Sequence, residues 1–103
     1  MNLSDFGRFT DPSLLILISL ADGPKHGYAI TEDIAQFFGL RLGPGTLYGA
    51  LSRLEAHGLI APLPPEERRR PYRLTAAGAT ALKDQLHSLE TITAVGRRRA
   101  LTP

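Results

Sequence analysis

The sequence predicts a mainly α-helical domain that carries one small β-hairpin. Apolar residues recur at helical spacing in four segments, and between residues 59 and 75 this period gives way to short extended segments bounded by proline. A chain of 103 residues is long enough for one domain with a helical appendage. It contains no cysteine, which excludes disulfide frameworks and thiolate metal sites and fits a reducing compartment.

The first two predicted helices have clear boundaries. Asp11 can cap the first helix and Pro12 suits its first position, because a missing N–H costs nothing there. The apolar run that follows leaves almost no polar face, so this helix should be buried on most sides until residues 22–24 end it. The second helix covers about residues 26–38 and stops at Gly39. Its apolar positions are Ile30, Ile34, Phe37 and Phe38.

The third predicted helix begins at Pro44 and ends at Gly58. Leu47, Leu51 and Leu54 form its apolar stripe. The rest of its surface is small and flat, with a hydroxyl and a guanidinium, and such a surface fits a groove. The residues on that surface are Gly45, Gly49, Ser52, Arg53 and Ala56.

Two short strands follow, at residues 59–63 and 71–75, around a charged connection. Pro62 and Pro71 cannot donate to a sheet ladder, so both strands are expected to be edge-like. Thr75 can cap a last helix that runs to about Val95. This helix carries a narrow apolar seam that resembles a coiled-coil interface and is expected to pack on a second copy of the chain, although packing within one subunit is the alternative. The seam comprises Leu82, Leu86, Leu89 and Ile92.

The order of helix, helix, helix, hairpin and helix is that of a winged helix-turn-helix with a C-terminal dimerisation helix. In that fold the third helix enters the DNA major groove, and the hairpin forms a wing beside it. The predicted organisation is an N-terminal arm at 1–10, a DNA-binding domain at 11–75, a dimerisation helix at 76–96 and a flexible basic tail at 97–103.

The charge distribution agrees with an anionic partner. The net charge is +2, but residues 1–40 carry −3, from two basic and five acidic side chains, and residues 41–103 carry +5, from ten basic and five acidic ones. Ten of the twelve cations are arginine, whose planar fork suits phosphate. Arg68, Arg69 and Arg70 fall in the predicted wing, and a merely solvated basic face is the alternative.

Four blocks of sequence resemble the PadR family of transcriptional regulators. They are His-Gly-Tyr at 26–28, Gly-Pro-Gly-Thr-Leu-Tyr at 43–48, Leu-Glu-Ala-His-Gly-Leu-Ile at 54–60 and Arg-Pro-Tyr-Arg-Leu-Thr-Ala-Ala-Gly at 70–78. The resemblance covers roughly residues 14–82, and the second block is specific in combination with the first. The chain is similar to the short-tailed branch of the family, with one dimerisation helix after the wing.

The resemblance implies a homodimeric repressor that binds a palindromic operator on double-stranded DNA and releases it on binding a small-molecule effector. One departure is visible, since the family commonly has serine where this chain has Gly43. Arg53 could contact either a guanine edge or a phosphate. The DNA-binding residues that the resemblance implies are Lys25, His26, Tyr28, Thr46, Tyr48, Ser52, Arg53, Arg68, Arg69, Arg70 and Tyr72.

Other classes of function find less support in the sequence. The three histidines lack metal-type spacing, and no serine or threonine pairs convincingly with a histidine and an acid, so no metal, cofactor or catalytic residue is expected. No segment has the pattern of a signal peptide or of a membrane-spanning helix, which predicts a cytoplasmic protein. The remaining alternatives are a winged-helix protein-interaction module without specific DNA binding, and a small-molecule-binding protein that uses the dimer interface.

Overall fold

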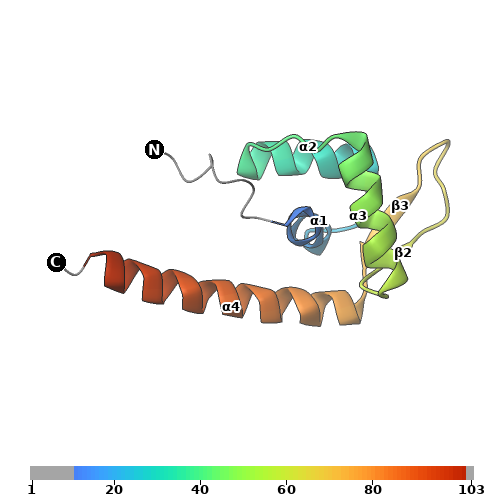
Figure 1. Ribbon diagram of the computed structural model, residues 1–103. Coiled ribbons are helices and arrows are strands. Elements are labelled where there is room, and N and C mark those ends of the chain that lie inside the picture. The colour runs from blue at the N-terminus through green and yellow to red at the C-terminus, as the bar shows by residue number, and fades with distance from the viewer. Residues whose placement is uncertain (1–10, 102–103) are drawn as a thin grey trace.

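The computed structural model describes residues 11–101, and the predicted N-terminal arm lies outside the described residues. In Figure 1 the other helices and a small sheet pack together, and the last helix passes below them and extends toward the C-terminus. The predicted fold class is confirmed. The elements are α1 (Pro12–Ala21), β1 (Lys25–His26), α2 (Gly27–Phe38), α3 (Pro44–Ala56), β2 (Ile60–Pro62), β3 (Pro71–Leu74) and α4 (Ala76–Ala100).

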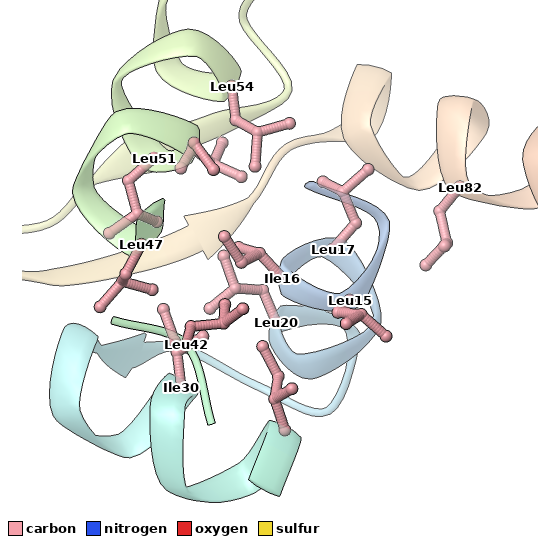
Figure 2. Close-up of a cluster of buried hydrophobic side chains, with 13 residues drawn as sticks. Leu15, Ile16, Leu17, Leu20, Ile30, Leu42, Leu47, Leu51, Leu54 and Leu82 are labelled. Carbon is pink, nitrogen blue, oxygen red and sulfur yellow. The ribbon is translucent and has the colours of Figure 1, made fainter. Parts of the chain in front are cut away.

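The hydrophobic core is built around α1. Side chains from α2, α3 and the start of α4 surround this helix (Figure 2), which explains why its sequence has almost no polar face. Phe37 and Phe38 follow the helical period of α2 but remain 45% and 51% exposed, because they lie beyond its last buried turn at Ile34. The buried apolar residues are Leu15, Ile16, Leu17, Leu20, Ile30, Ile34, Leu42, Leu47, Ala50, Leu51, Leu54, Ile60 and Leu82.

The helix caps that the sequence predicts are present. Asp11 accepts a hydrogen bond from the Ser13 N–H at 2.8 Å, and Thr75 Oγ1 accepts one from the Gly78 N–H at 3.0 Å. Gly39 ends α2 in the left-handed region with φ of 76°. Each of these caps joins residues close in sequence, which is why they could be predicted.

The sheet has three strands in the order β1-β3-β2, so the prediction of two edge-like strands is wrong for β3, which is central. Pro71 is the first residue of β3, where proline is tolerated, and it contributes its carbonyl oxygen to the Leu63 N–H at 2.8 Å. Lys25 pairs with Tyr72, and His26 pairs with Pro71. A two-residue polar strand leaves no periodic pattern in the sequence. It nevertheless joins the start of α2 to the wing.

Helix α4 ends at Ala100, five residues beyond the predicted end at Val95. Gly96 is compatible with a helical backbone, and arginine is a good helix former that interacts favourably with the carbonyl end of the helix dipole. Arg97, Arg98 and Arg99 therefore form the last turn of α4 rather than a tail outside it. Leu82, expected on the dimer seam, is only 7% exposed and packs into the core of its own chain, because the first turns of α4 contact α1.

Replacing Thr75 by alanine is expected to lower the free energy of unfolding by about 1–2 kcal/mol. The hydroxyl both caps α4 and donates to the Gly58 carbonyl at 2.7 Å, so the substitution removes two hydrogen bonds at one junction. Urea denaturation monitored by circular dichroism measures the change. Thr75→Ser is the control, because it keeps the hydroxyl and should retain most of the stability.

Candidate nucleic-acid interface

Helix α3 has one buried face and one open face. Leu47, Leu51 and Leu54 are at most 5% exposed, whereas Ser52 and Arg53 point to solvent. The Arg53 guanidinium lies back along the helix, and a β-carbon placed on Gly49 would be 3.5 Å from its Nη1 atom. Because the other residues of this face are small, the face is flat, and a flat helix face fits a groove, as the sequence analysis expects.

The N-terminus of α3 has no side-chain cap. Gly43 occupies the cap position with an extended backbone and makes no side-chain capping hydrogen bond. Its carbonyl accepts from the Leu47 N–H at 2.9 Å, so the earlier N–H groups of Gly45 and Thr46 receive no acceptor from this residue. Thr46 is exposed in the same turn. Free N–H groups at the positive end of a helix dipole favour an anionic ligand such as phosphate.

A cleft of about 390 Å³ lies between the wing and the start of α2. Three separate stretches of sequence meet there: β1 with the first turn of α2, the first turn of α3, and the hairpin between β2 and β3. In Figure 1 the hairpin projects beside α3 at the end of the molecule opposite the C-terminus. The cleft is lined by His26, Gly27, Tyr28, Tyr48, Arg68, Arg69, Arg70 and Tyr72, which include seven of the predicted DNA-binding residues.

The wing is a tight hairpin whose tip presents arginine. Glu66 and Arg69 exchange two backbone hydrogen bonds of 2.7 and 2.9 Å around the tip, with Glu67 in the left-handed region at φ of 56°. Arg70 donates to the Leu63 carbonyl at 3.0 Å and so braces the two sides of the hairpin. Arg68 is exposed at the tip. The hydrogen-bonded hairpin therefore holds the backbone of the three arginines in one conformation.

His26 connects the wing to α2. Its Nδ1 atom accepts from the Ala29 N–H at 3.3 Å as the cap of α2, and its Nε2 atom lies 3.3 Å from Nη1 of Arg69. A neutral imidazole has one lone-pair nitrogen, so it accepts only one of these two hydrogen bonds at a time. When it caps α2, its Nε2 carries a proton, and both this N–H and Arg69 can donate to an anion in the cleft.

Lys25 lies outside the cleft. Its side chain is 18% exposed, its ammonium donates to the Ser19 carbonyl, and it lies 3.8 Å from Asp22 and 3.9 Å from Asp33. The Ser19 hydroxyl also donates to Asp33 at 2.7 Å. Successive residues of a strand point to opposite faces, so His26 faces the wing while Lys25 joins α1 to α2. No pattern in the sequence indicates this role of Lys25, because it depends on contacts with residues of neighbouring elements.

Three tyrosines line the cleft, and two of them, Tyr48 and Tyr72, form part of its wall next to other elements. Tyr48 packs over the first residue of α2, since a β-carbon on Gly27 would lie 2.8 Å from its hydroxyl oxygen. Burial raises the pKa of Tyr72, and the nearby carboxylate of Glu55 adds to the increase. Tyr72 therefore stays protonated at neutral pH and keeps a hydroxyl that can donate a hydrogen bond.

Over residues 11–101, no group of three or more His, Asp or Glu side chains could hold a metal ion. None of the helices in this part of the chain is long and apolar enough to cross a membrane.

Comparison with known proteins agrees with this fold. The sequence profile of the Transcriptional regulator PadR-like family matches residues 16–84. Transcriptional regulator Rv3488 of Mycobacterium tuberculosis is 41% identical over 85 residues, which cover 77% of this chain and 76% of that protein. A PadR family transcription regulator from Clostridium difficile has a solved structure that matches with a TM-score of 0.78 and 27% identity, over 85% of this chain and 96% of that one.

The chain therefore belongs to the PadR-like family of transcriptional regulators, whose members are regulators and not enzymes. An uncharacterized 37.1 kDa protein in a transposon of Streptomyces fradiae is 54% identical over 82 residues, or 80% of this chain. The chain spans only 24% of the length of that relative, so the same domain also occurs within a longer protein.

Proposed function

We propose that this protein is a cytoplasmic transcriptional repressor that binds a palindromic operator as a homodimer. The observation that carries the proposal is that the wing arginines and Tyr48 of α3 line one cleft. The outward face of α3 would enter the major groove, while the wing and the start of α2 contact the phosphates on either side. The proposed DNA-contacting residues are His26, Tyr28, Thr46, Tyr48, Ser52, Arg53, Arg68, Arg69, Arg70 and Tyr72.

The flat face of α3 supports major-groove entry more than a protein-binding role. The outward face of α3 offers Ser52 and Arg53 beside two glycines and exposes no large aliphatic side chain, so it presents hydrogen-bond donors to a groove. Arginine is the side chain that most often makes specific contacts with guanine. The absence of a side-chain cap at Gly43 leaves the first turn of α3 open to phosphate.

The distal part of α4 supports the homodimer. Beyond Leu82 this helix leaves the core of its own chain, and Leu86 and Ile92 are 37% and 66% exposed, with Leu89 half-buried between them. A seam of exposed leucine and isoleucine on a projecting helix is stabilised when a second copy covers it. Two heads held by this seam would present two α3 helices to adjacent half-sites about one DNA turn apart.

An effector would act through this dimer. A hollow between α1, α3 and α4 is lined largely by apolar residues, Leu14, Leu17, Leu54 and Leu59 among them, but has a volume of only about 230 Å³. Ligand sites usually measure about 300–1,000 Å³. We therefore place the effector site where a second chain completes a pocket, so that the ligand changes the separation of the two heads. A coupling of about 1–3 kcal/mol is typical of such devices.

A gel shift and footprint on the DNA upstream of the protein's own gene tests the proposal. We expect a specific complex whose affinity falls steeply between about 50 and 200 mM salt, because phosphate contacts release counterions. The footprint should show two symmetric half-sites about 10 base pairs apart, and sedimentation should give a dimer. No complex even at low salt would refute the DNA-binding function and favour a protein-interaction module.

A further inference from the structure

On the outer face of α2, polar and charged side chains continue from the cleft along the helix. Tyr28 lines the cleft and is 65% exposed, and Glu32 follows it one turn along the same helix. Glu32 in turn accepts two hydrogen bonds from Arg41, at 2.6 and 3.3 Å. Polar and charged side chains therefore continue along α2, from the cleft that His26 and Arg69 line to the pair of Glu32 and Arg41.

Arg41 lies in the segment that joins α2 to α3. Its side chain is 60% exposed, while the next residue, Leu42, is 4% exposed and anchors the backbone in the core. The cap residue of α3, Gly43, follows immediately. In Figure 1 this segment runs back along α2 to the start of α3. Arg41 is thus a fixed cation beside the uncapped end of the helix that is proposed to enter the groove.

Arg41 can exchange its hydrogen bonds to Glu32 for hydrogen bonds to another anion at little cost in stability. The hydrogen bonds from Arg41 lower the pKa of Glu32, so both groups are charged at neutral pH. The pair is nevertheless open to solvent, with exposed fractions of 60% and 42%, and such pairs contribute little to stability. A DNA phosphate offers the guanidinium the same two-oxygen geometry as the carboxylate, with no loss of hydrogen bonds.

We propose that Arg41 is a further contact to the DNA backbone, and that Glu32 holds and neutralises it in the free protein. On binding, a phosphate takes the place of the Glu32 carboxylate. This inference rests on the DNA-binding function proposed above. Glu32 then has a defined role as a carboxylate that competes with DNA for Arg41, which lowers affinity for all sequences alike.

The test compares Arg41→Ala with Glu32→Gln in the full chain, using a random-sequence DNA duplex long enough for both subunits. Arg41→Ala should weaken binding by about tenfold per contact. It should also make the slope of log affinity against log salt shallower by about 0.9 per lost contact. Glu32→Gln should strengthen binding by up to about fivefold per subunit, because the competing charge is gone. Fluorescence anisotropy at several salt concentrations gives both quantities.

The sign of the Glu32 effect separates this inference from a structural role. If the ion pair only fixed the turn before α3, both substitutions would break it and both would weaken binding, which would overturn the proposal. An unchanged salt slope in Arg41→Ala would overturn it as well. Lys83→Ala on α4 is the matched control, since it removes one exposed cation from a helix that contributes no residue to the cleft. Failure of the wild-type protein to bind any duplex would instead refute the DNA-binding function itself.

Discussion

Replacing Arg68, Arg69 and Arg70 together by alanine is expected to lower affinity for DNA on the order of a hundredfold or more at physiological salt. These cations stand on an ordered hairpin at the rim of the cleft, so they meet phosphates without first having to be immobilised. Each lost contact should also reduce the slope of log affinity against log salt by about 0.9. Gel shifts at several salt concentrations measure both changes.

The matched control replaces Arg97, Arg98 and Arg99, which removes the same charge from the last turn of α4. This turn lies at the opposite end of the molecule from the wing (Figure 1), so the control should change DNA affinity much less. Equal losses in the two triple variants would mean that net charge, rather than the wing, determines binding. Circular dichroism of each variant separates a loss of contacts from a loss of fold.

Gly78→Ala is expected to lower the free energy of unfolding by about 3 kcal/mol. A β-carbon on Gly78 would lie 2.0 Å from the carbonyl oxygen of Leu59 and 2.8 Å from Cδ1 of Leu74. The Leu59 carbonyl cannot move aside easily, because it accepts a hydrogen bond from the Thr75 N–H at 3.1 Å. Thermal and urea denaturation measure the loss.

Gly96→Ala is the control within the same helix. Nothing lies within 4 Å of a β-carbon built on Gly96, so alanine should stabilise α4 there by about 0.5–1 kcal/mol through its helix propensity. Opposite signs for these two glycine substitutions would show that the close approach of α4 to the Leu59 backbone sets the cost at Gly78. A Gly78→Ala variant as stable as the wild type would contradict the geometry described above.

The position of Gly78 illustrates what the sequence could not reveal. Its block, residues 70–78, contributes to the resemblance to the PadR family, yet the reason for a glycine there is the backbone of Leu59, 19 positions earlier. Lys25 is a similar case, since its environment consists of Ser19, Asp22 and Asp33 from neighbouring elements. Both roles depend on contacts between elements, and a pattern within one element does not record them.

Within single elements the sequence correctly predicted most helix ends and buried faces. Asp11, Gly39 and Thr75 mark helix ends because a cap joins residues only a few positions apart. The buried faces of α1 and α3 follow from helical spacing for the same reason. Helix α4 continues past its predicted end at Val95 and shows the limit of predictions from single residues. Gly96 would end the helix only if its backbone adopted the left-handed conformation.

The sequence by itself determined the order of the helices and the hairpin, most of their ends, the basic character of the second half and the family to which the chain belongs. Only the tertiary structure decided that β3 is a central strand, that Leu82 belongs to the core of its own chain, and that Arg69 meets His26 across the cleft. The physical reason is the separation along the chain over which each interaction acts. Periodicity and capping act over a few residues, whereas strand pairing, burial and the meeting of charges depend on how whole elements pack.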